Sequence, residues 1–427
     1  MISNTHTKNI PSVITIVFLS TSFLVSTVFM YIGLVINVTL FLFVLLLKNK
    51  INLIKINLVI EDKHVLWLFY MFFFVSFSIV SFLNLFVSGV SYIKYYPSIF
   101  GRMANITICF VLFLHIVNEK NKEKISTKIL LNAYVAGCSI LLFFGIWQIL
   151  NIIFYIPYPD FETRDQIHTM DVTGTLPFFT RRVTSIALEP AFLIPFLIDA
   201  IIILFYTTKK YYWIILFAIV LFFTLSLSGY VNIFLIILIM LFFAKKTIKT
   251  FFVKIFVLIS SVFVLYLTQN VFIVVFQRLN PAELLLSGRL QNSILSIRHM
   301  FFEASVFNFL FGFGPRGMSY IRNFVFYTSG WRQGEMIGTT THIIFVDFFV
   351  EHGIVGVLAI ILLFCYLFAL ATKGYNKTGN RLGQVLCLNL IISSLYTADY
   401  ASPRFTIIMI LLLCLYKDGQ NKKILEV

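Results

Sequence analysis

One histidine and one glutamate combine residue type and position in a way that suits acid–base chemistry. His342 follows three consecutive threonines and opens an apolar stretch. An imidazole titrates near neutral pH and takes protons from hydroxyl groups, so His342 is a candidate general base; a histidine with satisfied hydrogen bonds is the alternative interpretation. Glu189 follows Arg181 and Arg182 and lies inside another apolar stretch, where an ionisable side chain is costly and usually functional.

Arginines supply a second kind of chemistry, the binding of phosphate oxygens. The guanidinium is a planar fork that holds such oxygens in pairs and keeps its charge near lipid. The candidates are Arg181, Arg182, Arg289 and Arg316, and the last lies in the glycine-dense segment Gly312–Gly317. The backbone amides of such a turn are able to cradle an anion. The alternatives are a plain turn and arginines that extend outward to lipid headgroups.

Other familiar sites are missing from the sequence. No glycine-rich loop ends in Gly-Lys-Ser or Gly-Lys-Thr, so nothing indicates nucleotide hydrolysis. The five cysteines lie within apolar runs without zinc spacing, which favours packing in a core. Asp160 and Glu162 form an acidic pair of the kind that holds a divalent cation in some glycosyltransferases, although such pairs often arise by chance. We therefore expect no metal and no cofactor.

Composition indicates the class of protein that carries these residues. Of the 427 residues, 59% are hydrophobic and only 12% are charged, and the mean hydropathy is +0.94. Globular domains are about half apolar and about a quarter charged. We therefore expect an all-α polytopic membrane protein with one integral membrane domain over residues 1–427. The net charge of +15 then reflects membrane topology and not nucleic-acid binding.

Apolar runs of about 20 residues are long enough to cross a bilayer as helices. About twelve such segments are present, if two long runs are divided near Gly33 and at Ser226–Tyr230. The expected spans are Pro11–Thr27, Tyr31–Leu47, His64–Phe86, Ile99–Val117, Ile129–Phe154, Ile186–Tyr206, the two halves of Tyr211–Ala244, Phe251–Thr268, Ile343–Ala371, Leu382–Tyr396 and Phe405–Tyr416.

Lysines and arginines segregate between alternate loops. All of the 21 lysines except Lys94 lie in one set, which the positive-inside rule assigns to the cytoplasm together with both termini. All of the 12 arginines except Arg381 lie in or beside the opposite, outer loops, against the usual tendency of cations. Two outer loops, residues 155–185 and 269–341, are long, and loops of such length usually carry function.

Two local features are predicted within and after the longer loop. Residues 286–302 have helical periodicity and are expected to lie along the membrane surface. The apolar face of that helix is expected to contain Leu290, Ile294, Ile297 and Phe301. The segment Glu351–Gly356 brings an acid and two glycines into the run Ile343–Ala371, so we expect a helix break there and a span that begins near Ile354.

Taken in chain order, these motifs resemble those of the O-antigen polymerase and O-antigen ligase superfamily. That family has a similar number of spans, a dominant late outer loop, an outer arginine, a serine–glycine tip, a Gly-Arg pair, a Gly-x-Gly, and a histidine before Glu-x-Gly-Ile-x-Gly. The matching residues are Arg181 or Arg182, Ser226–Gly229, Gly288-Arg289, Gly312–Gly314, His342 and Glu351–Gly356. One difference is Ile343, where the family often has asparagine after the histidine. The resemblance implies a GT-C-like helical fold.

The resemblance also implies a mechanism and a location. The enzyme would join undecaprenyl-pyrophosphate-linked oligosaccharide repeat units into O-antigen or capsule-type polysaccharide on the outer side of a bacterial cytoplasmic membrane. Arg289, with Arg181 or Arg182 and with Arg316, would neutralise the pyrophosphate leaving group, so ATP would not be needed. His342 would take or orient the proton of the acceptor hydroxyl, and Glu189 would support or replace it. Besides membrane lipid, a chain-length regulator is a further candidate partner.

Two other functions share part of this pattern. An O-antigen ligase would use the same donor with a lipid core as acceptor, and its sequence features are the same. The variety of polymerases and the strong Phe, Ile, Lys and Asn bias favour a polymerase. A flippase or transporter would favour inverted repeats, short loops and charges near the midplane, for which Asp199 is the only candidate.

Overall fold

The computed structural model describes the greater part of the chain. The described residues are 10–50, 62–87, 96–121, 125–159, 161, 182–208, 210–242, 288–318, 321, 341, 343–397 and 400–420. Within them the chain is helical, and its one extended contact is an isolated bridge between Thr27 and Ala187. The expected all-α class is therefore confirmed for these residues.

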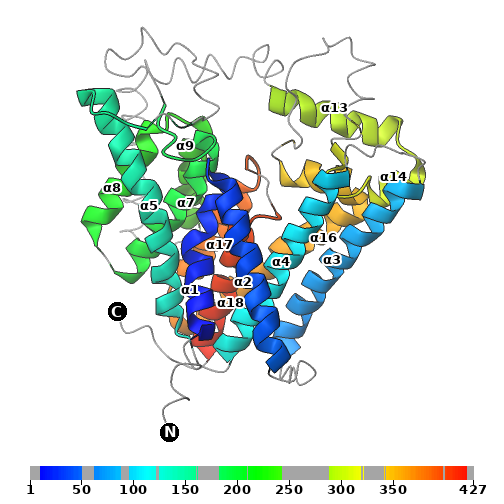
Figure 1. The fold of residues 1–427 in the computed structure, drawn as a ribbon, viewed down its shortest axis with the longest axis horizontal. Helices are drawn as coiled ribbons and strands as arrows, with labels where there is room; N and C mark the ends of the chain where they lie inside the picture. Colours follow the sequence, from blue (N-terminus) through cyan, green and yellow to red (C-terminus); the bar gives the residue numbers. More distant parts are fainter. Residues whose placement is uncertain are drawn as a thin grey trace. The chain divides into compact units, whose positions relative to one another are not determined.

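Most expected spans correspond to helices (Figure 1). In chain order these are α1 (Ile10–Thr21), the 3-10 helix η1 (Ser22–Ser26), α2 (Met30–Lys50), α3 (Asp62–Val87), α4 (Tyr96–Asn121), α5 (Thr127–Phe154), α7 (Pro190–Thr207), α8 (Tyr211–Phe223), α9 (Leu227–Phe242), α13 (Gly288–Phe302), α14 (Val306–Phe311), α16 (Ile344–Thr378), α17 (Leu382–Ser393) and α18 (Pro403–Gln420). Within the described residues, α4, α5, α7 and α16 are long and apolar enough to cross a membrane. The expected span Phe251–Thr268 lies outside the described residues.

Contacts between residues divide the chain into two compact units. Unit 1 comprises Met1–Val25, Met30–Gly137 and Gly288–Glu426, and unit 2 comprises Ser26–Phe29, Cys138–Ser287 and Val427. In unit 1, α16 packs against α3, α13, α14, α17 and α18, while α4 packs against α1, α2, α3 and α18. In unit 2, α7 packs against α8 and α9. Helix α16 is therefore the element of unit 1 with the most described neighbours.

The first long apolar run is divided where the two expected spans, Pro11–Thr27 and Tyr31–Leu47, meet. The 3-10 helix η1 ends at Ser26 and α2 begins at Met30, so Gly33 itself lies just inside α2. A Cβ atom on Gly33 would come within 2.9 Å of the Leu24 Cβ and 3.0 Å of the Val25 nitrogen. The glycine therefore serves a close approach between α2 and η1.

The other two divisions agree with the sequence. Helix α8 ends at Phe223 and α9 begins at Leu227, which confirms a turn at the start of the Ser226–Tyr230 segment. In α16, Gly353 has φ 67° and ψ −166°, so the helix breaks there and resumes at the next residue. The break predicted within Glu351–Gly356 is confirmed.

The predicted loop helix is present as α13, and its packing shows which of its faces contacts the protein. In Figure 1, α13 runs crosswise to α3 and α4 at one end of unit 1. Its buried side chains are Ser293, Ser296, His299 and Met300, whereas Ile294 is 45% exposed and Phe301 is 58% exposed. The polar face thus packs on the protein and the apolar face points outward. An outward apolar face is what a helix at a bilayer surface would present.

Candidate functional site

The break in α16 is held by a second glycine from the loop after α14. Gly312 has φ 76° and ψ −173°, and it shares with Gly353 a backbone conformation that is essentially restricted to glycine. The two backbones touch: a Cβ on Gly312 would collide with the Glu351 carbonyl, and one on Gly353 would collide with the Leu310 carbonyl. Both positions therefore require glycine for conformation and for space.

Main-chain hydrogen bonds complete this clamp on α16. The amides of the glycine-dense segment donate to four carbonyls, with N···O distances of 2.7 Å for Gly312 to Asn308, 2.8 Å for Phe313 to Val350, 3.0 Å for Gly314 to Glu351 and 2.8 Å for Gly317 to Gly314. These amides are occupied, so the anion cradle expected from them is not formed. Arg316 is half-buried with φ 65°, and its role as a pyrophosphate ligand stays a prediction.

Next to the clamp, polar side chains from separate segments of unit 1 meet inside the helix bundle. Ser81 comes from α3, Arg102 from α4, Glu351 and His352 from the residues before the break in α16, and Tyr400 from the turn before α18. Each of them is between 0% and 5% exposed. Ionisable side chains buried among apolar helices are costly and usually functional. We call these five residues the polar cluster.

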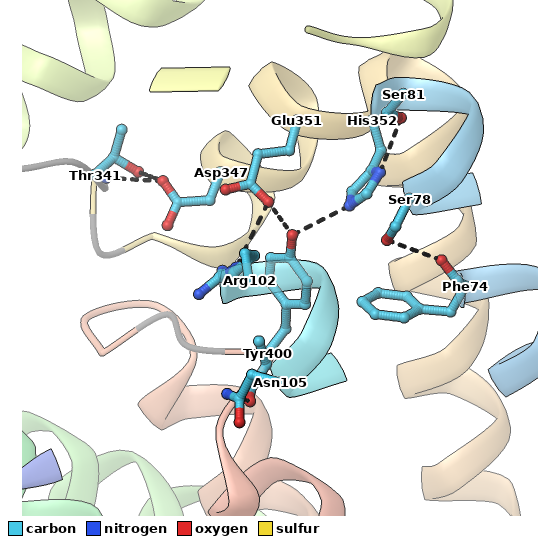
Figure 2. Close-up of polar contacts among 11 residues, drawn as sticks. Phe74, Ser78, Ser81, Arg102, Asn105, Thr341, Asp347, Glu351, His352 and Tyr400 are labelled. Atoms are coloured by element: carbon cyan, nitrogen blue, oxygen red, sulfur yellow. Dashed lines mark hydrogen bonds and ion pairs between the residues drawn. The ribbon is translucent and has the colours of Figure 1, made fainter. Parts of the chain in front are cut away.

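Contacts run through the polar cluster without interruption (Figure 2). Ser81 Oγ lies 3.2 Å from His352 Nδ1, and His352 Nε2 lies 3.2 Å from the Tyr400 hydroxyl oxygen. That hydroxyl also hydrogen bonds with Glu351 Oε2. The Arg102 Nε lies 3.9 Å from the same carboxylate oxygen, and its Cζ lies 4.2 Å from the centre of the Tyr400 ring. One hydroxyl therefore links a carboxyl group to an imidazole.

A second carboxylate, Asp347, lies one helical turn before Glu351. It is 2% exposed, and Oδ1 accepts hydrogen bonds from the Thr341 amide at 2.8 Å and the Thr341 hydroxyl at 2.7 Å. Its other oxygen, Oδ2, has no hydrogen-bond partner among the described residues. Figure 2 shows both carboxylates projecting from α16 on the side of Arg102. Unit 1 thus buries two carboxylates near one guanidinium.

Aromatic rings form the walls of the polar cluster. The ring centres of Phe348 and Tyr400 are 4.5 Å apart, and those of Phe74 and Tyr400 are 5.1 Å apart. Phe348 and Phe77 also contact the imidazole of His352, at 5.1 Å and 5.5 Å between ring centres. These rings keep water away, and electrostatic interactions are stronger in such surroundings than in water.

Unit 2 brings together two other parts of the sequence pattern. Arg182 Nε donates to the carbonyl oxygen of Thr224 at 3.2 Å, where Thr224 terminates α8. The serine–glycine tip follows directly, and its Ser226 and Ser228 hydroxyls are 2.9 Å apart. The outer arginine and the serine–glycine tip, which are far apart in the sequence, are therefore neighbours in the fold.

The segment after Arg182 is fixed by the side chain of Gln148 in α5. Gln148 Oε1 accepts the amides of Thr184 at 2.9 Å and Ser185 at 2.7 Å. The Ser185 carbonyl in turn accepts the hydroxyl of Tyr158 at 3.0 Å, and burial raises the pKa of Tyr158 above its ordinary value, so this hydroxyl stays protonated. The chain turns at Ser185 and Ile186, where the Ala187 amide donates to the Thr184 carbonyl at 3.0 Å, and α7 begins at Pro190 and not at Ile186 as expected.

The predicted site residues are distributed over both units. Glu189 is half-buried at the N-cap of α7, directly before Pro190. Asp199, the deep acid considered for transport, is fully buried within α7. Arg289 is the second residue of α13. Arg181 and His342 lie outside the described residues, so their roles stay predictions.

Sequence reasoning did not single out Arg102, Asp347 or Tyr400. For Arg102 and Asp347 a signal existed, since each is an ionisable residue inside an apolar run, the same observation that drew attention to Glu189. Tyr400 gave no such signal, because tyrosine is common in this chain and its partners are 48 and 49 residues away.

No known protein-family model matches the chain, and no curated protein matches it in sequence. The two clusters of residues are therefore interpreted from their own geometry and from the order of motifs along the chain.

Proposed function

We propose that this protein is a membrane glycosyltransferase that joins lipid-linked oligosaccharide repeat units into a polysaccharide of the O-antigen or capsule type. The donor would carry undecaprenyl pyrophosphate, which both activates the sugar and leaves. The reaction would take place at the outer side of a bacterial cytoplasmic membrane and would need no cofactor.

The observation that carries this proposal is that separate parts of the motif pattern pack together in pairs. In unit 1, the main chain of Gly312–Gly314 binds the carbonyls of Val350 and Glu351, which belong to the Glu-x-Gly-Ile-x-Gly region. In unit 2, Arg182 binds the end of α8 directly before the serine–glycine tip. These two pairings are what we offer in support of the proposal.

Within the proposal, the arginines carry the electrostatic part of catalysis. Departure of pyrophosphate develops negative charge, and positioned cations that meet this charge usually make the largest contribution to such a reaction. Arg182, held by a main-chain carbonyl, is oriented without being neutralised by that bond. Arg181, Arg289 and Arg316 are the further proposed ligands. His342 would accept the proton of the acceptor hydroxyl, with Glu189 as its support.

The decisive genetic experiment is a gel of surface glycolipids from cells in which the gene is deleted and then restored. A polymerase predicts that single-repeat glycolipid remains after deletion while the long-chain ladder disappears, and that the native gene restores the ladder. Restoration with the double variant Arg289→Ala, His342→Ala should leave single repeats only. Arg381→Ala, which changes the arginine assigned to the inner side, is the matched control and should restore the ladder.

Other band patterns would assign the other functions. If deletion removes every glycan-bearing band, then export or ligation has failed, and the proposal of a polymerase is wrong. Lipid-linked repeats that accumulate in the outer leaflet would then indicate a ligase, and accumulation in the inner leaflet would indicate a flippase. A full ladder in the double variant, at native abundance in the membrane, would contradict the proposed roles of the two residues.

A further inference from the structure

The hydrogen bonds of the polar cluster have a direction that begins at Ser81. Its hydroxyl oxygen lies 3.1 Å from the carbonyl oxygen of Phe311, and a carbonyl only accepts. The single hydroxyl proton of Ser81 is therefore used in that bond. The 3.2 Å contact between Ser81 Oγ and His352 Nδ1 then requires that Nδ1 carries a proton and donates it.

The same count of hydrogen-bond protons extends from His352 through Tyr400 to the carboxyl group of Glu351. If His352 is neutral with its proton on Nδ1, its Nε2 is an acceptor and must receive the hydroxyl proton of Tyr400 across 3.2 Å. Tyr400 has no second proton to give, so its hydrogen bond with Glu351 Oε2 must be donated by a protonated Glu351. The alternative is an imidazolium that donates to Tyr400, which then donates to an ionised Glu351. Both arrangements contain the same number of protons.

The charges around the cluster independently favour one bound proton, held by one of the two carboxyl groups. Arg102 from α4 is the cation that faces Glu351, and Asp347 is the second carboxylate on α16. With both carboxylates ionised, this buried group would have an excess negative charge, and an uncompensated buried charge is costly. One bound proton makes the group neutral.

Charged groups on the other helices that pack against α16 are engaged elsewhere. On α18, Arg404 donates to the Ser393 hydroxyl at 3.0 Å. On α13, His299 and Glu303 pair with each other at 2.8 Å. Helix α3 contributes the uncharged Ser81 to the cluster. Among the described residues, Arg102 is the cation within ion-pair distance of Glu351.

We propose that Glu351, Tyr400 and His352 form a buried proton-binding site, in which one proton is shared between the carboxyl group and the imidazole through the Tyr400 hydroxyl. In the resting state the proton is on Glu351, because aromatic walls favour a neutral pair over separated charges. Transfer moves the Glu351 proton to the Tyr400 oxygen while Tyr400 passes its own proton to His352 Nε2. The products are a carboxylate and an imidazolium, and no other group changes. The site goes beyond the proposed function and does not depend on it.

Infrared spectroscopy of the full chain in lipid nanodiscs tests this site without any substrate. At neutral pH the native protein should show the carbonyl stretch of a buried protonated carboxyl group. The band should shift when glutamate is labelled with carbon-13 and should not shift when aspartate is labelled. It should disappear in Glu351→Gln and move to a different frequency in Tyr400→Phe, which removes the hydroxyl bonded to that carboxyl group.

Glutamine at position 351 has the shape of a protonated glutamate and can donate to the Tyr400 oxygen, so the variant should fold. Tyr400→Phe provides a second test if it does not. An imidazolium signal from nitrogen-15 histidine in place of the carboxyl band would contradict the resting position of the proton on Glu351. The proposal is overturned if the carboxyl band is absent, if the band follows the aspartate label, or if it survives in folded Glu351→Gln.

Discussion

The two units hold their central arginines in different ways. In unit 1, Arg102 is 5% exposed, faces a carboxylate oxygen at 3.9 Å and lies against the ring of Tyr400. In unit 2, Arg182 is half-buried and donates to a main-chain carbonyl at a helix end. A carboxylate neutralises a guanidinium, whereas a carbonyl only orients it. For this reason we propose Arg182, and not Arg102, as a ligand of the phosphate.

The largest effect is expected from the glycine clamp that positions the polar cluster of unit 1. Gly353→Ala should cost roughly 1–3 kcal/mol for its backbone conformation alone. Its Cβ would also collide with the Leu310 carbonyl, and relief of that collision requires movement of the main chain, so the total should exceed the cost of the other changes below. We expect strong loss of folded protein, measured as a lower Tm of the purified protein. Gly379→Ala is the matched control, because Gly379 also has positive φ, 71°, but a Cβ there meets nothing within 4 Å. An equal loss of Tm in both variants would show that the close contact between Gly353 and the Leu310 carbonyl is not the source of the effect.

The next effect concerns the buried pair of unit 1. Arg102→Ala leaves the buried carboxyl groups of Glu351 and Asp347 with an uncompensated negative charge, and breaking a buried pair in this way costs about 3–5 kcal/mol. Unfolding by denaturant should show this loss, and the double variant Arg102→Ala, Asp347→Asn should recover part of it, because asparagine carries no charge. A double variant that is less stable than the sum of the single changes would contradict the pairing.

Arg182→Ala should give the opposite pattern in unit 2. Its charge-assisted hydrogen bond to the Thr224 carbonyl is worth about 1.5–3 kcal/mol, so folded protein should remain. Polymer formation should fall at least about tenfold, because the loss of a cation at a leaving group typically costs more than 1.4 kcal/mol of transition-state stabilisation. The readout is the long-chain ladder at equal protein abundance, and Arg182→Lys should retain more activity than Arg182→Ala. An unchanged ladder would show that Arg182 does not contribute to polymer formation and would contradict the different roles proposed for the two arginines.

The smallest effect tests how Arg182 is positioned. Gln148→Leu removes the oxygen that accepts two amides of the following segment, at a cost of about 1–3 kcal/mol. We expect partial loss of the ladder with modest loss of stability. Gln148→Glu keeps an oxygen for both amides and should retain the ladder. If the leucine and glutamate variants behave alike, the amide bonds do not position Arg182.

Much of the helical framework was predictable, because apolar runs and glycines act locally. The run His64–Phe86 is helix Asp62–Val87, and the glycines of Glu351–Gly356 predict the break found at Gly353. The division near Gly33 lies between Ser26 and Met30, whereas the close approach that Gly33 allows to η1 has no local signal in the sequence.

The polar cluster was not predictable in the same way. The contact between Tyr400 and His352 depends on how the turn before α18 packs against α16, and no local pattern specifies that packing. The rotation of α13 about its own axis is a similar case. Periodicity identifies the two faces of this helix but does not say which face packs on the protein.

The most direct test of the proposed function is a reaction with the purified protein in nanodiscs. Its donor is the lipid-linked repeat extracted from cells in which the gene is deleted, and the products are separated by size. The proposal predicts products of several repeats and one released undecaprenyl pyrophosphate for each new linkage, without ATP, and little of either with Arg182→Ala. If the native protein leaves the lipid-linked repeat unchanged in this mixture while it restores the ladder in cells, the chain does not itself form the linkage.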